Sequence, residues 1–139
     1  MTNIEIKTVT VNDVVQLQQI SRRTFQEAFS AGNSEEDMKK YLDEEFTAEK
    51  LAAELKDPNA EFYFTTLDDE VIAYLKLNFG PSQTELKDDK ALEIERIYVL
   101  KEFHGKNVGQ VLYDKAIQRA RRLMQTTFGW VSGKKTRER

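Results

Sequence analysis

The residues with the most specific chemical pattern lie between positions 93 and 110, where a β-rich run leads through a short loop into a helical pattern. The first turn of a helix has unpaired backbone N–H groups, and its dipole favours negative charge. Gly105 and Gly109 allow a ligand to approach the backbone closely, and Lys106 adds a positive charge. The segment therefore predicts an anion site suited to a pyrophosphate. An ordinary strand-to-helix turn with a solvated lysine is the alternative.

Other kinds of site are excluded by composition. The chain has 139 residues, no cysteine and a single histidine, His104. Disulfides, thiolate zinc sites, cysteine nucleophiles and histidine-rich metal sites are therefore excluded, and we expect no metal. The length suits one domain, and the 40% apolar and 32% charged residues are typical of a soluble globular protein.

The sequence also predicts a cytoplasmic location without membrane contact. No apolar run approaches the ~18 residues that span a bilayer, and the N-terminal residues lack the basic and apolar regions of a secretory signal.

Charge is distributed unevenly along the chain. The net charge is −3, but residues 1–118 carry −9 and residues 119–139 carry +6. The acidic part can attract a cationic substrate through its field. The acidic runs 35–37 and 43–45 are candidates for that role, and solvated helix faces are the alternative.

The first half of the chain has one strand pattern followed by three helical patterns. Residues 4–9 alternate as a strand does, and Asn12 offers an N-cap for a helix over residues 13–29. Ser34 is expected to begin a second helix, whose apolar positions recur from Met38 to Phe46. Thr47 can cap a third, short helix that ends before Pro58.

The second half predicts three strands and a final helix. Residues 62–66 and 71–77 flank an Asp-Asp turn, which predicts an antiparallel hairpin. Residues 92–100 form another strand, with Ile94, Arg96 and Tyr98 expected on one side and Glu93, Glu95, Ile97 and Val99 on the other. Residues 107–124 form the last helix. The order β-α-α-α-β-β-β-α predicts a mixed α/β or α+β fold, with a mainly antiparallel sheet flanked by helices.

Residues 93–99 (Glu-Ile-Glu-Arg-Ile-Tyr-Val) and 104–110 (His-Gly-Lys-Asn-Val-Gly-Gln) resemble the acetyl-CoA motif of the GCN5-related N-acetyltransferases, the GNAT superfamily. In that family the strand ends in a bulge that holds the pantetheine arm, and the loop (Gln/Arg)-x-x-Gly-x-(Gly/Ala) wraps the pyrophosphate. The resemblance therefore implies a three-layer fold and acetyl-CoA as co-substrate. It assigns cofactor binding to Ile97, Tyr98, Val99, His104, Gly105, Lys106, Asn107, Val108, Gly109 and Gln110.

Two positions depart from this motif. His104 stands at the Gln/Arg position, and Asn107 stands where the family has its middle glycine. Asparagine tolerates a left-handed backbone better than most residues, but its side chain can crowd a phosphate.

The resemblance extends from residue 1 to about residue 125. Residues 24–29, 36–42, 61–64 and 70–78 are similar to the bacterial spermidine/spermine acetyltransferase branch. This branch implies a small primary amine as substrate, such as a polyamine.

The resemblance also implies the chemistry. A neutral amine attacks the thioester while carboxylates or ordered waters take its proton, and a tyrosine on a later helix protonates the thiolate. Glu95 is the candidate for the base or water-positioning role. A strand residue paired in a salt bridge with Arg96 or Lys76 is the alternative interpretation of Glu95.

The last residues depart from the family. One codon choice for residues 128–139, read two nucleotides later, encodes Trp-Leu-Gly-Val-Trp-Glu-Lys-Asn-Glu-Arg-Ala, which is typical of the family's next segment. We therefore expect an incomplete acetyltransferase domain over residues 1–125 and a frameshifted basic tail over residues 126–139. The missing segment would carry the tyrosine acid, so activity is in doubt.

Two other functions and one assembly state are consistent with the sequence. The chain can be an inactive GNAT remnant that binds only CoA or a protein. A nucleic-acid module using Arg119, Arg121 and Arg122 is disfavoured by the acidic body, so no nucleic-acid partner is expected. Exposed strand edges predict either that residues 126–132 pair with the sheet locally or that two chains associate as a homodimer, which we favour.

Overall fold

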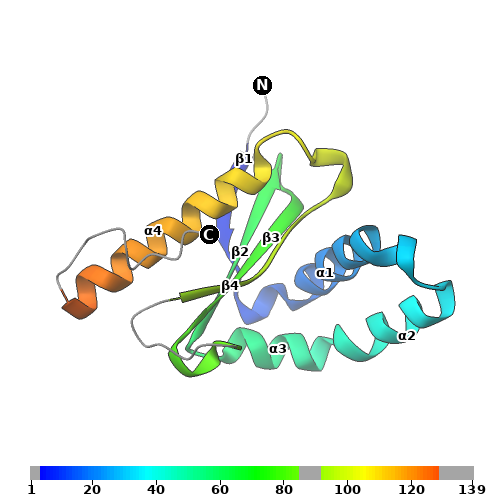
Figure 1. The fold of residues 1–139 in the computed structure, drawn as a ribbon, viewed down its shortest axis with the longest axis horizontal. Coiled ribbons are helices and arrows are strands. Elements are labelled where there is room, and N and C mark those ends of the chain that lie inside the picture. Colours follow the sequence, from blue (N-terminus) through cyan, green and yellow to red (C-terminus); the bar gives the residue numbers. More distant parts are fainter. Residues whose placement is uncertain (1–3, 85–91, 129–139) are drawn as a thin grey trace.

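The computed structural model describes residues 4–84 and 92–128, with side chains described as far as residue 123 (Figure 1). The predicted element order is confirmed. The elements are β1 (Ile4–Thr8), α1 (Val14–Phe29), α2 (Glu35–Glu45), α3 (Ala48–Lys56), β2 (Ala60–Leu67), β3 (Glu70–Phe79), β4 (Leu92–Val99) and α4 (Val108–Phe128). Helix α4 is therefore longer at its C-terminal end than predicted.

The strands form one antiparallel sheet in the order β1-β2-β3-β4. Helices α1 and α3 contact one side of it, whereas α4 packs on β2, β3 and β4 from the opposite side (Figure 1). The predicted three-layer fold is confirmed. Apolar side chains fill both interfaces of the sheet, among them Leu17, Leu51, Phe62, Leu75 and Leu112.

Two of the three predicted helix N-caps are confirmed. The Ser34 hydroxyl accepts from the Asp37 amide at 3.0 Å, and the Thr47 hydroxyl accepts from the Lys50 amide at 3.1 Å. The predicted cap Asn12 is wrong. Thr10 caps a 3-10 turn (Val11–Asp13) that precedes α1, because its hydroxyl and amide can pair with Asn12 and Asp13 in a capping box.

The β2–β3 hairpin is confirmed. Asp68 and Asp69 both have left-handed backbones, with φ of 52° and 73°. Two left-handed residues in a two-residue turn match the right-handed twist of the flanking strands.

A bulge in β4 overturns the predicted alternation of this strand. Lys76 pairs with Arg96 and the next residue of β3, Leu77, pairs with Ile94, so Glu95 has no partner opposite it. An extra residue resets the two-residue period, as bulges do. Glu95 therefore lies beside Arg96 on the α1–α3 side, and Ile97 lies on the α4 side, opposite to its predicted grouping with Glu95.

Helix α4 is attached to the sheet by a polar contact as well as by apolar packing. The Arg119 guanidinium donates to both oxygens of Glu61 on β2, at 2.8 and 2.6 Å. Burial raises the pKa of Glu61, but hydrogen bonds from Arg119 and Tyr63 outweigh it and hold that pKa below its ordinary value.

Two predicted features lie wholly or partly outside the described residues. They are most of the polar loop over residues 82–90 and, beyond the end of α4 at Phe128, the tail. Within residues 4–84 and 92–128, no helix has the length and apolar character needed to cross a bilayer.

Candidate functional site

A cavity of about 740 Å³ opens where the end of β4 meets the start of α4. Its wall combines three parts of the fold: α1, the end of β4, and the turn that leads into α4. The residues lining it are Thr24, Glu27, Ala28, Ile97, Tyr98, Val99, Lys101, Phe103, His104, Gly105, Asn107, Val108, Gly109 and Gln110.

The structure brings together nine of the ten residues that the motif assigned to the cofactor. Lys106 is the exception and lies outside the lining. The α1 wall and two residues of the turn, Lys101 and Phe103, lie outside the motif and were not predicted. Only the packing of α1 against the sheet places Thr24 and Ala28 beside a motif about seventy positions away. In the sequence, the one-turn spacing of Thr24 and Ala28 on the predicted helix was the feature that could have indicated a common face.

The turn before α4 contains two left-handed residues. Gly105 has φ 80° and Asn107 has φ 64°. The Val111 amide donates to the Asn107 carbonyl at 3.2 Å. The amides of residues 108–110 precede this bond and so have no partner within the helix. They are donors at the positive end of α4, on the cavity wall.

Gly109 lies next to β4. A Cβ atom built there would meet Val99 Cγ2 at 3.8 Å, an ordinary van der Waals distance. The fold itself therefore has room for a side chain at this position. A ligand against the helix N-terminus would use that room instead.

Side-chain contacts hold the turn in place. Nε2 of His104 lies 2.8 Å from the Val99 carbonyl, so this nitrogen carries the proton and donates it. The Glu27 carboxylate accepts from the Lys101 amide at 2.7 Å. One contact joins the turn to β4, and the other joins it to α1.

A second cavity of about 460 Å³ lies on the α1–α3 side of β4. Four aromatic rings, three carboxylates and two cations line it: Phe25, Tyr41, Phe46, Tyr98, Glu45, Glu54, Glu95, Lys50 and Arg96. The Phe25 and Tyr41 rings stack at 4.6 Å between centroids. Tyr98 lines both cavities, so the two cavities adjoin along β4.

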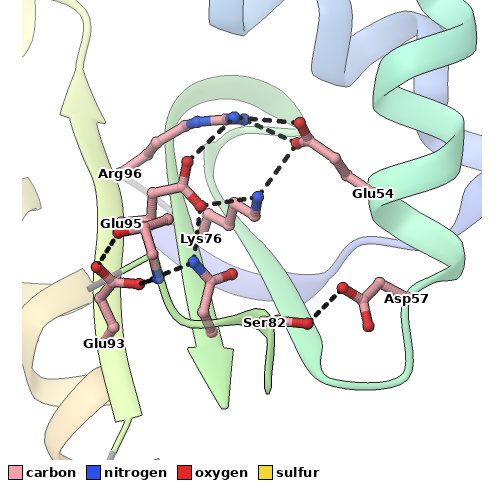
Figure 2. A network of polar contacts seen from close by, with 9 residues as sticks. Glu54, Asp57, Lys76, Ser82, Glu93, Glu95 and Arg96 are labelled. Carbon is pink, nitrogen blue, oxygen red and sulfur yellow. Dashed lines mark hydrogen bonds and ion pairs between the residues drawn. The ribbon is translucent and has the colours of Figure 1, made fainter. Parts of the chain in front are cut away.

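Glu95 lies in this second cavity and not in the first. Its Oε1 is 2.8 Å from Lys76 Nζ and accepts from Asn78 at 2.7 Å, and its Oε2 is 3.4 Å from Arg96. Figure 2 shows Glu54, Glu95, Lys76 and Arg96 converging from α3, β3 and β4. The alternative interpretation, a salt-bridged strand residue, therefore describes its contacts correctly.

The charge state of Glu95 follows from these contacts. Burial raises its pKa, but hydrogen bonds from Lys76 and Asn78 and the charge of Arg96 outweigh burial. Its pKa lies below the ordinary value, and the group is a carboxylate at neutral pH. Such a group attracts cations and accepts hydrogen bonds, but it is a weaker base than an ordinary glutamate.

The two cavities suggest a two-substrate site. The first offers backbone donors and a helix dipole to an anionic group, and the second offers carboxylates and aromatic faces to a cation. The sequence comparison decides the family. The model of the acetyltransferase (GNAT) family matches residues 14–135. The chain belongs to the GNAT family.

A curated relative agrees with this assignment. An uncharacterized N-acetyltransferase in the pepI 3' region of Lactobacillus delbrueckii subsp. lactis is 40% identical over 121 residues. The match covers 87% of this chain and 70% of the relative. The chain is therefore a GNAT N-acetyltransferase, and acetyl-CoA is the acyl donor that GNAT enzymes use.

Solved structures of acetyltransferases share the fold at lower identity. The PaiA N-acetyltransferase of Thermoplasma acidophilum, in complex with coenzyme A, has a TM-score of 0.73 and 21% identity over 86% of this chain and 73% of its own. An aminoglycoside acetyltransferase from an uncultured soil sample, in complex with sisomicin, has a TM-score of 0.61 and 17% identity over 84% and 69%.

The candidate metal ligands that the structure describes are the His, Asp and Glu side chains within residues 4–84 and 92–128 of this GNAT chain. No group of three or more His, Asp or Glu side chains there could hold an ion.

Proposed function

We propose that the first cavity binds acetyl-CoA and that the second binds a small primary amine, which the enzyme acetylates. The observation that carries this proposal is the position of Tyr98 in the walls of both cavities. Two substrates that react must meet, and these cavities adjoin at one strand.

The residues present fit the cofactor. Acetyl-CoA carries a pyrophosphate, and the amides of residues 108–110 together with the α4 dipole favour an anion. The absence of side chains at Gly105 and Gly109 leaves the backbone open to it. We assign pyrophosphate binding to residues 104–110 and contact with the pantetheine arm to Ile97, Tyr98 and Val99. Lys106 stays in this assignment as a charge near the mouth, although it does not line the cavity.

When bound, acetyl-CoA supplies an acetyl thioester that a neutral amine can attack. The protein has to collect the ammonium form of the amine and remove one proton from it. The ionised Glu95 attracts the ammonium and orients a water that receives its proton. Its low pKa favours this indirect role over direct proton transfer.

For the acceptor we propose a polyamine. The lining of the second cavity supports it, because its three carboxylates outnumber its two cations and its aromatic faces attract alkylammonium groups. Glu45 lies at the C-terminal end of α2, is exposed and belongs to the acidic run 43–45. A second ammonium of a long amine can reach this surface while the first reacts. The acidic run 35–37 is exposed at the other end of α2 and is solvated.

The activity test compares acceptors and one matched pair of variants. Spermidine, spermine and a simple monoamine are assayed with acetyl-CoA, and acetyl-CoA binding is measured separately by calorimetry. We expect transfer to the polyamines, with Glu95→Gln lowering kcat more than it lowers acetyl-CoA affinity. Glu93→Gln is the control, because Glu93 contacts Asn78 and Thr84 but lines neither cavity.

Three results would contradict parts of this proposal. Binding of acetyl-CoA without transfer to any amine would favour an inactive remnant. Transfer to the monoamine alone would exclude the polyamine. An equal loss in Glu95→Gln and Glu93→Gln would remove the specific role of Glu95.

We also propose that two chains associate. β4 is at the edge of the described sheet, where it pairs only with β3. Edge strands present unpaired backbone groups that another chain can bind. Light scattering over a concentration series is expected to show a dimer, and a strict monomer at high micromolar concentration would exclude it.

We also propose a change of reading frame from about residue 126. The coding DNA of residues 125–139 decides it. A codon choice that does not encode the family segment in the shifted frame would reject it.

A further inference from the structure

Lys76 is a buried cation between two carboxylates. It lies on β3 and is 7% exposed. Its Nζ is 2.8 Å from Glu95 Oε1 and 3.4 Å from Glu54 Oε1, and it lies over the Phe62 ring at 5.6 Å. A buried charge is costly unless it is paired, and the two carboxylates supply that pairing.

The two oxygens of Glu95 are used unequally. Oε1 has the short contacts, with Lys76 and with Asn78. Within residues 4–84 and 92–128, Oε2 has only the 3.4 Å contact with Arg96. One oxygen is therefore fixed to β3, and the other retains capacity for a further hydrogen bond.

Arg96 holds Glu95 less firmly than Lys76 does. Its guanidinium is committed to Glu54 on α3, with both oxygens of that carboxylate at 3.0 and 3.2 Å (Figure 2). The charged or polar groups around Glu95 are thus Lys76 and Asn78 from β3, Glu54 from α3, and Glu93 and Arg96 from β4. Glu45 and Lys50 lie across the second cavity.

The contact between Lys76 and Glu95 is important because of the place of Glu95 in β4. It is the extra residue of the β4 bulge and has no partner opposite it in the register. The strand ladder therefore fixes its backbone less than that of its neighbours. The ion pair with Lys76, on the neighbouring strand β3, fixes the Glu95 side chain instead.

We propose that Lys76 is a positioning residue for acetyl transfer, which holds the Glu95 carboxylate at the bulge with Oε2 free for the acceptor amine or its water. This rests on the proposed function of Glu95. Lys76 lines neither cavity, so it acts through Glu95 and does not touch a substrate.

The first measurement does not depend on activity. Carboxyl-carbon NMR follows the titration of Glu95, identified by the signal lost in Glu95→Gln. In Lys76→Met the titration midpoint is expected to rise by about one pH unit or more, because the nearest cation is gone. In Glu54→Gln the midpoint of the Glu95 titration is expected to fall. Lys76 and Arg96 then interact with Glu95 without competition from the Glu54 carboxylate. An unchanged midpoint in both variants would overturn the electrostatic contact.

The second measurement separates positioning from general damage. In Lys76→Met, kcat with the amine is expected to fall about ten-fold or more while KM for acetyl-CoA stays within about two-fold. An equal change in kcat and in KM for acetyl-CoA, or an unchanged kcat, would overturn the positioning role. Circular dichroism checks the fold, and if Lys76→Met does not fold, the Glu54→Gln titration decides whether the cations hold Glu95.

The two measurements also distinguish this inference from the proposed function. If the unmodified chain acetylates no amine, the proposed function fails. The NMR titration still decides whether Lys76 controls the charge of Glu95. If the chain is active and the midpoint does not move, only the role of Lys76 fails.

Discussion

The carboxylate of Glu27 accepts a hydrogen bond from the backbone amide of Lys101 at 2.7 Å, across 74 positions of sequence. This bond joins α1 to the turn that leads from β4 into α4. Glu27 and Lys101 both line the first cavity. The helix that closes one wall of the cavity is thus fixed to the loop that forms another.

Removal of this bond is expected to weaken acetyl-CoA binding. In Glu27→Ala the Lys101 amide loses its acceptor, and we expect a loss of about 1 kcal/mol in the free energy of unfolding. Glu27→Gln retains an acceptor oxygen and is expected to lose less. Calorimetry with acetyl-CoA and urea denaturation measure the two effects. A normal affinity in Glu27→Ala would show that the turn holds its shape without this contact.

Gly109→Ala is expected to separate folding from cofactor binding. The added Cβ meets Val99 only at 3.8 Å, and alanine favours helix over glycine, so stability is expected to stay equal or rise by up to about 1 kcal/mol. The same methyl group occupies the space against the helix N-terminus, so acetyl-CoA affinity is expected to fall. Thermal unfolding and calorimetry give the two values.

The control for Gly109→Ala is Gly32→Ala. A Cβ at Gly32 meets nothing within 4 Å, and this residue lines neither cavity. Its acetyl-CoA affinity is expected to stay unchanged. Equal affinities in the two variants would argue against a ligand at the start of α4.

Asn107→Gly tests the departure from the family motif. Asn107 has φ 64°, a conformation that glycine adopts without steric cost. The smaller residue also removes a side chain from the wall of the cavity. We therefore expect tighter binding of acetyl-CoA by a few-fold. An unchanged or weaker affinity would show that Asn107 does not limit cofactor binding.

Stability is expected to fall in acid through three carboxylates of the sheet. Glu61, Glu93 and Glu95 have pKa values below the ordinary 4.5 in the folded state. A lowered folded-state pKa stabilises the protein above the unfolded-state value, and this contribution is lost as pH falls through the folded-state pKa. Urea unfolding from pH 7 to pH 3 is expected to show a constant free energy above about pH 5.5 and a decline below about pH 4.5.

A single variant checks the source of this decline. Glu61→Gln keeps the shape of the side chain but cannot ionise, so its stability is expected to depend less on pH below 4.5. An identical decline in the variant would place the effect in other groups, such as Asp43, whose pKa is lowered by hydrogen bonds from Lys39 and Arg22.

The order of the elements was predictable from local patterns. Aromatic and β-branched residues marked β2, and period-two alternation marked β3. Ser34 and Thr47 marked helix starts, and Asp68-Asp69 marked the hairpin turn. The strand-turn-helix unit before α4 was also predictable, since Gly105 and Gly109 precede or begin a helix. These features depend on residues within a few positions of one another, so the sequence by itself determines them.

Tertiary structure alone decided the features that depend on distant residues. The bulge at Glu95 depends on the register with Lys76 and Leu77 and not on the alternation within β4. That register places Glu95 on the same side of the sheet as Arg96. There, Lys76 of β3 and Arg96 of β4 stabilise its ionised form. Likewise, Thr24 and Glu27 reach the cofactor motif only because α1 packs across the sheet. Local periodicity carries no information on which strands pair in which register, and the charge and surroundings of Glu95 follow from that pairing.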